Sequence, residues 1–142
     1  MIRVRQANKQ VILRSLRKMS ISPYGVTDPD GYLYQRRLEA VVRPCGPLLK
    51  RYVQGRNLLC VFMYDDDTKT LGVQIGLPEK NNCVIGLSLK ALDKGYDFAT
   101  FILLHEIAHL KVRGHGPDFS AYLDALIQIF NENTGKHIVR PW

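Results

Sequence analysis

The 142-residue sequence contains no apolar run close to the roughly 18 residues that a membrane-spanning helix needs. Its N-terminus also lacks the apolar stretch of about 7–15 residues that marks a secretory signal. No internal repeat or low-complexity tract is visible, and the hydrophobic fraction of 46% is enough to build a core. These features predict an intracellular globular protein of one domain with no membrane partner.

Cysteine is scarce, with Cys45, Cys60 and Cys83 widely spaced, odd in number and never in a CxxC pair. This usage argues against both a disulfide framework and a zinc ribbon. We interpret all three as buried thiols in a reducing compartment, either the cytoplasm or the nucleus or nucleoid.

Acidic residues are missing from the first 27 positions. Residues 1–60 carry twelve Lys and Arg against three acids, a net charge of +9, whereas residues 61–142 carry a net charge of −2. This asymmetry predicts a surface for DNA, RNA or another polyanion, although a solvated basic helix face or an Arg-rich transit peptide would have the same composition. The candidate nucleic-acid residues are Arg3, Arg5, Lys9, Arg14, Arg17 and Lys18.

Hydrophobic periodicity predicts helices first, then a small sheet, then helices again, which is the order of an α+β fold. Gly114 is expected to end the penultimate helix and Asp97 to cap its start, while Pro117 begins the last helix and Gly135 closes it. The three apolar runs in the middle predict a meander. The expected helices cover residues 4–19, 33–43, 98–112 and 117–134, and the expected strands cover 57–64, 69–77 and 83–89.

The expected domain spans residues 1–142 and has three parts. They are a basic N-terminal segment (1–27), a helix-plus-sheet region (28–96), and an active-site helix with a C-terminal covering helix (97–135). The helix before Gly114 is apolar on nearly every side, which is typical of a helix buried on all faces.

That buried helix carries an HExxH sequence. His105 and His109 are four residues apart and therefore lie on one helical face, so that both imidazoles can bind a single ion. Glu106 points about 100° away and can instead reach a water on the ion. His115 is the candidate third ligand, and three ligands with one open position predict a single catalytic Zn²⁺ rather than a structural one.

The chemistry expected of this set is hydrolysis. Zinc lowers the pKa of a bound water to near 7 and polarises a carbonyl, while Glu106 would act as general base and then general acid. Two packed histidines on an apolar helix are the alternative. That alternative requires partners for three buried polar side chains, whereas one metal ion satisfies them together.

The segment HEIAHLKVRGHGPDF, with VIGLSLKAL some twenty residues upstream, resembles the active-site region of SprT-like and WLM metallopeptidases, the Spartan-related zincins. The resemblance is specific over about residues 84–130. It implies a zincin-like fold, zinc ligands at His105, His109 and His115, and Glu106 as catalytic base. It also implies a small, mostly antiparallel sheet of three or four strands, with an edge that holds an extended peptide. Several relatives act on DNA-bound proteins, which suits the basic N-terminal half.

Three other classes share parts of this pattern. The metzincins are excluded, because Val112 replaces their glycine and no methionine follows Met63. A YbeY-like RNA endonuclease has the same histidine spacing and stays an alternative, although its glycine and aspartate hallmarks are absent. The last alternative is a non-catalytic nucleic-acid-binding domain with structural zinc, for which His137 is the remaining histidine ligand.

A peptidase also needs a donor that stabilises the oxyanion of the tetrahedral intermediate. Tyr122 and Arg113 are the candidates that we select, and Tyr96 and Arg140 are further possibilities. The expected partners are a protein or peptide substrate and, through the basic N-terminal half, a polyanion.

Overall fold

A computed structural model describes residues 33–52, 57–64, 71–77 and 82–141 of the chain. The predicted helix over residues 4–19 and the candidate nucleic-acid residues lie outside these ranges. No helix within the described ranges is both long and apolar enough to span a bilayer.

The first described helices form one interrupted rod. Helix α2 (Leu33–Val42) continues through a 3-10 turn, η1 (Arg43–Cys45), into α3 (Gly46–Tyr52). The interruption has a local cause, because Pro44 lacks the N–H group that would extend the hydrogen-bond ladder of α2. The buried residues of the rod are Leu38, Val41, Val42, Cys45, Leu48 and Leu49.

Cys45 confirms the predicted buried thiol for one of the three cysteines, since it is fully buried and free. Burial raises the pKa of its thiol to about 12, so this group stays neutral and unreactive near neutral pH. The side chains of Cys60 and Cys83 lie outside the described part of the structure.

The sheet has the strand order β1-β3-β2, with β1 at Asn57–Tyr64, β2 at Gly72–Leu77 and β3 at Asn82–Ser88. Strand β3 pairs parallel with β1 and antiparallel with β2. The prediction of a meander is therefore wrong. The sheet was also expected to be mostly antiparallel, but within the described residues it is mixed, with one parallel and one antiparallel pair of strands. The α+β class is confirmed.

The third strand in sequence is the central one, with β1 on one edge and β2 on the other. Its residues Ile85 and Leu87 have no exposed surface, and neither has Val61 on the edge strand β1. A short apolar pattern predicts where a strand occurs, but it does not determine the order in which strands pair.

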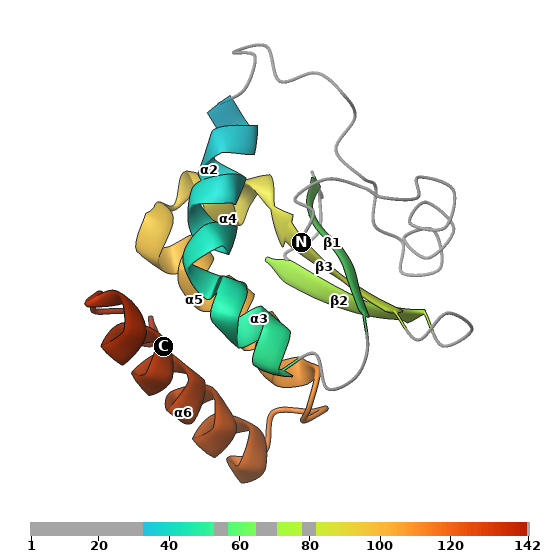
Figure 1. Ribbon diagram of the computed structural model, residues 1–142, viewed down its shortest axis with the longest axis vertical. Coiled ribbons are helices and arrows are strands. Elements are labelled where there is room, and N and C mark those ends of the chain that lie inside the picture. Colours follow the sequence, from blue (N-terminus) through green and yellow to red (C-terminus); the bar gives the residue numbers. More distant parts are fainter. Residues whose placement is uncertain (1–32, 53–56, 65–70, 78–81, 142) are drawn as a thin grey trace.

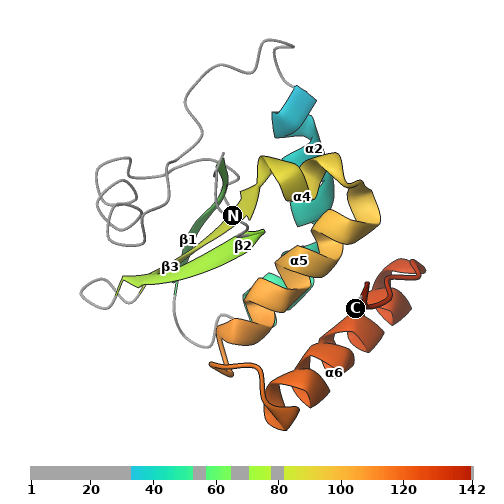
Figure 2. The same ribbon diagram turned by 180° about the vertical axis from the view of Figure 1, so that it is seen from behind.

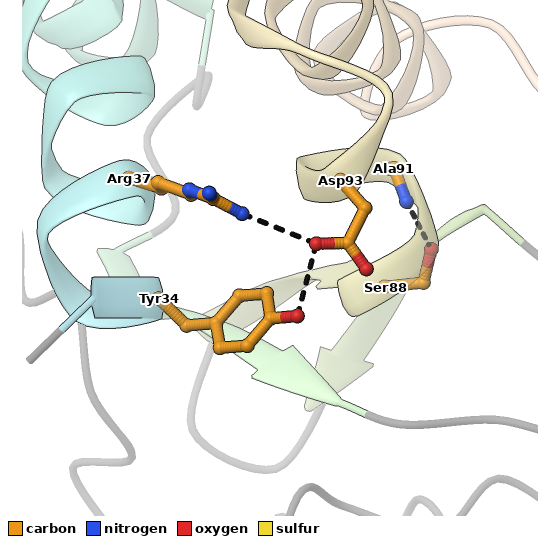
Figure 3. Close-up of polar contacts among 5 residues, drawn as sticks. All are labelled: Tyr34, Arg37, Ser88, Ala91 and Asp93. Carbon is orange, nitrogen blue, oxygen red and sulfur yellow. Dashed lines mark hydrogen bonds and ion pairs between the residues drawn. The ribbon is translucent and has the colours of Figure 1, made fainter. Parts of the chain in front are cut away.

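Helix α4 (Leu89–Asp93) follows β3 directly and is capped by Ser88, whose hydroxyl accepts a hydrogen bond from the Ala91 N–H at 3.0 Å (Figure 3). This short helix was not predicted from the sequence. On its far end, the Asp93 carboxylate accepts a hydrogen bond from Tyr34 at 2.9 Å and pairs with Arg37 at 3.1 Å. These contacts join α4 to α2, and their exposure limits the ion pair to about 0–1 kcal/mol.

Helix α5 (Tyr96–His109) is the central element of the fold. It contacts α2, α4, α6 and the strands β2 and β3, and both ribbon views place it between the sheet and α6 (Figures 1 and 2). Most of its side chains are buried, as its apolar pattern predicts. The cap at Asp97 was predicted wrongly: Gly95 is the N-cap residue, with a φ of 110° that favours glycine, and Asp97 lies in the first turn.

Helix α6 (Pro117–Thr134) covers α5 on the side away from the sheet (Figure 2). Both predicted boundaries are confirmed: Pro117 begins the helix and Gly135, with a φ of 72°, ends it. The chain then returns along α6, because the Asn131 amide both donates to the Ile138 carbonyl at 3.0 Å and accepts from its N–H at 2.9 Å. This return places Arg140 beside the N-terminal half of α6, where it contacts Ser120 and Asp124.

Candidate metal centre

Three imidazoles meet at the C-terminal end of α5. His105 and His109 lie one turn apart with ring centroids separated by 4.7 Å. His115 reaches them from the following loop, and the Nε2 atoms of His109 and His115 are 3.1 Å apart. Across the whole group, one ligand nitrogen from each residue lies within 4.8 Å of the others.

The spacing of these nitrogens fits a transition-metal ion. Two nitrogens bound tetrahedrally to zinc at about 2.0–2.1 Å lie roughly 3.3 Å from each other, close to the 3.1 Å between His109 and His115. Neutral imidazole nitrogens are also the donors that zinc prefers. Within the described ranges no fourth His, Cys, Asp or Glu joins the group, which is the donor number of an open, catalytic site.

The tautomer of His109 is set by the end of its own helix. Its Nδ1 lies 3.1 Å from the carbonyl oxygen of Val112, so that Nδ1 donates and Nε2 keeps a lone pair for a metal. Helix α5 ends at His109 itself. The predicted helix, which ran to Val112 before Gly114, is therefore three residues too long. Gly114 instead adopts a φ of 80° in the loop that returns His115.

Burial is the main cause that lowers the pKa of His109 below its ordinary value of 6.5. The Val112 carbonyl and the charge of Glu106 act in the opposite direction, and the other two imidazoles add to the lowering. His109 is thus neutral near pH 7, which is the form that binds a metal.

Glu106 is buried beside this cluster, with 5% of its surface exposed. Its Oε2 atom lies 3.6 Å from Nδ1 of His105, which is too far for a hydrogen bond. Oε2 has no hydrogen-bond partner among the residues that the structure describes. A buried carboxylate without a partner is costly, and a water or an ion at the adjacent cluster would relieve that cost.

Phe119, at the start of α6, forms an apolar wall against all three imidazoles. Its ring stacks on His109 at 4.2 Å and stands edge-on to His105 and His115 at 5.1 and 5.2 Å. The sequence pattern gave no sign that Phe119 belongs to the site. The contact between Phe119 and the histidines depends on how α6 crosses α5. A short sequence pattern does not predict that crossing.

We therefore expect Phe119→Leu to weaken zinc binding by about 10–100-fold, the usual cost of losing a residue that orients the ligands. Leucine keeps the site apolar but cannot stack on His109. Phe130→Leu is the matched control, because Phe130 is equally buried on the same helix. Competition with a fluorescent chelator measures the affinity, and equal affinities in the two variants would contradict a role for Phe119 at the site.

A cavity of about 140 Å³ opens between α5 and α6 beside the cluster. Arg140 lies at this cavity, held by an ion pair to Asp124 at 2.9 Å and by a hydrogen bond to the Ser120 carbonyl at 3.3 Å. The lining residues are Phe101, His105, His115, Phe119, Ser120, Leu123 and Arg140.

The candidate oxyanion donors lie in different places. Arg140 lines the cavity with His105 and His115. The hydroxyl of Tyr122 is buried, and its ring lies 5.2 Å from Nζ of Lys111. Arg113 is exposed in the loop before His115.

Two further candidate residues lie away from the imidazole cluster. Tyr96 begins α5 nine residues before His105, about 13 Å along the axis, and lines a separate cavity with Arg37. His137 is exposed and does not belong to the cluster.

The fold and the site together define an α+β architecture in which a buried helix presents two histidines and a carboxylate, with a third histidine from the next loop. Comparison with solved structures places this architecture near Wss1 from Saccharomyces cerevisiae. One Wss1 structure, a mutant, is similar with a TM-score of 0.55 and 17% sequence identity, over 73% of this chain and 84% of that chain.

A second Wss1 structure gives a TM-score of 0.52 at 18% identity, over 73% of this chain and 85% of the other. At this level of identity the likeness establishes the fold. No family model matches the sequence, and no curated protein matches it.

Proposed function

We propose that this chain is a zinc-dependent metallopeptidase. The observation that carries the proposal is the three-imidazole cluster with the buried carboxylate of Glu106 beside it, 3.6 Å from His105. Three neutral ligands leave one coordination position for substrate or water, as in catalytic zinc sites. The fold is consistent with the same conclusion, because the structure resembles Wss1 and the segment HEIAHLKVRGHGPDF independently resembles the active-site region of WLM metallopeptidases.

The residues of the site divide the work of hydrolysis. His105, His109 and His115 would hold zinc, which supplies a Lewis acid for the scissile carbonyl. Glu106 would accept a proton from the attacking water and donate it to the nitrogen of the departing amine, so that the C–N bond breaks and the carboxylate is regenerated.

In this proposal the cavity between α5 and α6 binds one side chain of the substrate. Its volume of about 140 Å³ is small beside the roughly 300–1,000 Å³ of pockets that enclose a whole ligand. Phe101 and Leu123 give it an apolar floor, and Arg140 adds a positive charge. A substrate side chain seated there would lie next to two of the proposed zinc ligands.

Metal analysis combined with a cleavage assay tests the proposal. Purified protein should contain one zinc ion per chain and cleave casein or a quenched fluorescent peptide. A chelator should abolish cleavage, and added zinc should restore it. A folded protein that binds no transition metal, or that cleaves equally well after chelation, would contradict the proposed function.

We further propose that the substrates include proteins associated with DNA, brought close by the basic N-terminal half. Residues 1–60 carry a net charge of +9, and binding to phosphates by such a segment releases counterions. The candidate contacts are Arg3, Arg5, Lys9, Arg14, Arg17 and Lys18.

Affinity for single-stranded DNA should accordingly fall steeply between 50 and 200 mM salt. The double variant Arg14→Gln/Arg17→Gln should reduce the salt slope by about one for each phosphate that is no longer neutralised. Lys90→Gln/Lys94→Gln is the control with the same charge change. Fluorescence anisotropy gives the slopes, and an affinity that does not respond to salt would reject this role.

A further inference from the structure

Gly72, the first residue of β2, lies directly against the part of α5 that carries Glu106. Gly72 pairs with Leu87 on β3. The residue before it, Leu71, extends this pairing, because its carbonyl accepts a hydrogen bond from the Ser88 N–H at 3.0 Å. Strand β2 and helix α5 are therefore packed with backbone against side chain at this position.

A side chain at position 72 has no room. A Cβ atom there would lie 2.7 Å from Cγ2 of Ile102, 3.0 Å from Cγ of Glu106 and 3.3 Å from its carboxyl carbon. The first distance is shorter than real Cβ contacts allow, and the other two are tighter than most. Either α5 would have to move away from β2, or the two side chains would have to change position.

This crowding distinguishes Gly72 from other glycines of the described structure. Gly95, Gly114 and Gly135 adopt positive φ angles and have no atom within 4 Å of a Cβ. Gly46 and Gly116 are equally open and have negative φ angles. Gly72 needs no unusual backbone conformation, so it is the space, and not the backbone freedom of glycine, that matters there.

The packing matters for chemistry because the described residues make few polar contacts with the Glu106 carboxylate. Its Oε2 atom has no hydrogen-bond partner among the described residues, and His105 is 3.6 Å away. A carboxylate that is not fixed by hydrogen bonds is located by the atoms it touches. On the side that faces the sheet, the Glu106 side chain lies against the backbone of Gly72.

We propose that Gly72 is a positioning residue, whose lack of a side chain sets where the Glu106 carboxylate lies relative to the three imidazoles. This inference rests on the proposed peptidase function. It adds a residue from the sheet, 34 positions before Glu106 in the sequence, to a site otherwise built from α5, α6 and the loop between them.

The test is Gly72→Ala with Gly46→Ala as the matched control, since Gly46 is helical and open. A general base displaced by about 1 Å can cost roughly 100-fold in rate. We expect kcat of Gly72→Ala to fall by about that factor, with KM within about twofold of the wild type and one zinc still bound. A crystal structure of the variant should show the Glu106 carboxylate displaced. Gly46→Ala should behave as wild type.

A second variant separates displacement of Glu106 from loosening of the fold. Gly72→Ala/Ile102→Ala removes the 2.7 Å clash with Ile102 but keeps the 3.0 Å approach to Glu106. Adding Gly72→Ala should therefore cost less thermal stability in the Ile102→Ala background than in the wild type, while kcat stays low. Ile102→Ala alone shows how the shortened side chain by itself changes thermal stability and kcat.

Three results would overturn the role of Gly72: wild-type kcat in Gly72→Ala, an unmoved carboxylate, or recovery of kcat together with stability in the double variant. Failure of the proposed function looks different, because the wild-type protein itself would then show no metal-dependent cleavage.

Discussion

Replacing Glu106 with Gln is expected to reduce peptide hydrolysis by about 10²–10⁴-fold while leaving zinc bound. Glutamine has the shape of glutamate, but its amide cannot accept and return a proton, and general acid–base catalysis contributes about this much to a rate. Glu106 is not one of the clustered donor residues, so metal content should not change. Steady-state cleavage of a fluorescent peptide, together with elemental analysis of the same sample, measures both quantities.

The matched control is Glu132→Gln, an exposed glutamate on α6 whose contact is a hydrogen bond from Gln128 at 3.2 Å. It makes the same chemical change away from the cluster and should keep wild-type activity. Two results would argue against Glu106 as the base. Wild-type cleavage by Glu106→Gln would show that no proton passes through it. Loss of zinc from that variant would instead indicate that Glu106 orients a ligand.

Replacing His109 with Ala is expected to remove zinc and, with it, all activity. His109 contributes the nitrogen that lies 3.1 Å from His115, and its other nitrogen is anchored to Val112. Its loss leaves two ligands on different segments of the chain. The affinity for zinc should fall by more than the roughly 10–100-fold that the loss of an outer-shell partner costs. Isothermal titration with zinc measures this directly.

His137→Ala is the control for this experiment, because His137 is exposed and lies outside the cluster. It should bind zinc as the wild type does. If His137→Ala loses zinc as completely as His109→Ala, the site has a fourth protein ligand, and the structural-zinc alternative replaces the catalytic one.

Local patterns in the sequence predicted the helices and strands well where they carry strong periodicity or clear end signals. The buried character of α5 and the limits of α6 at Pro117 and Gly135 were confirmed. The short helix α4 was missed, because five residues are too few for an apolar repeat to show. Its cap at Ser88 was the available signal, since serine is among the preferred N-cap residues.

The candidate site was predictable to the extent that it is local. His105 and His109 share a helical face because of their spacing alone, and Gly114 indicated that the helix ends before His115. The end of α5 at His109 was not predictable in the same way. It depends on a hydrogen bond between a ring nitrogen and the Val112 carbonyl, which forms only once the loop has folded back.

By itself the sequence determined which side chains make up the candidate site: three histidines and one glutamate, placed by helical periodicity and a short loop within eleven consecutive residues. Only the tertiary structure decided what surrounds them. The crossing of α6 brought Phe119 against the imidazoles, and the order β1-β3-β2 placed Gly72 against Glu106. The reason is physical: backbone geometry over a few residues is set by local sterics, whereas contacts between distant segments depend on how whole surfaces pack together.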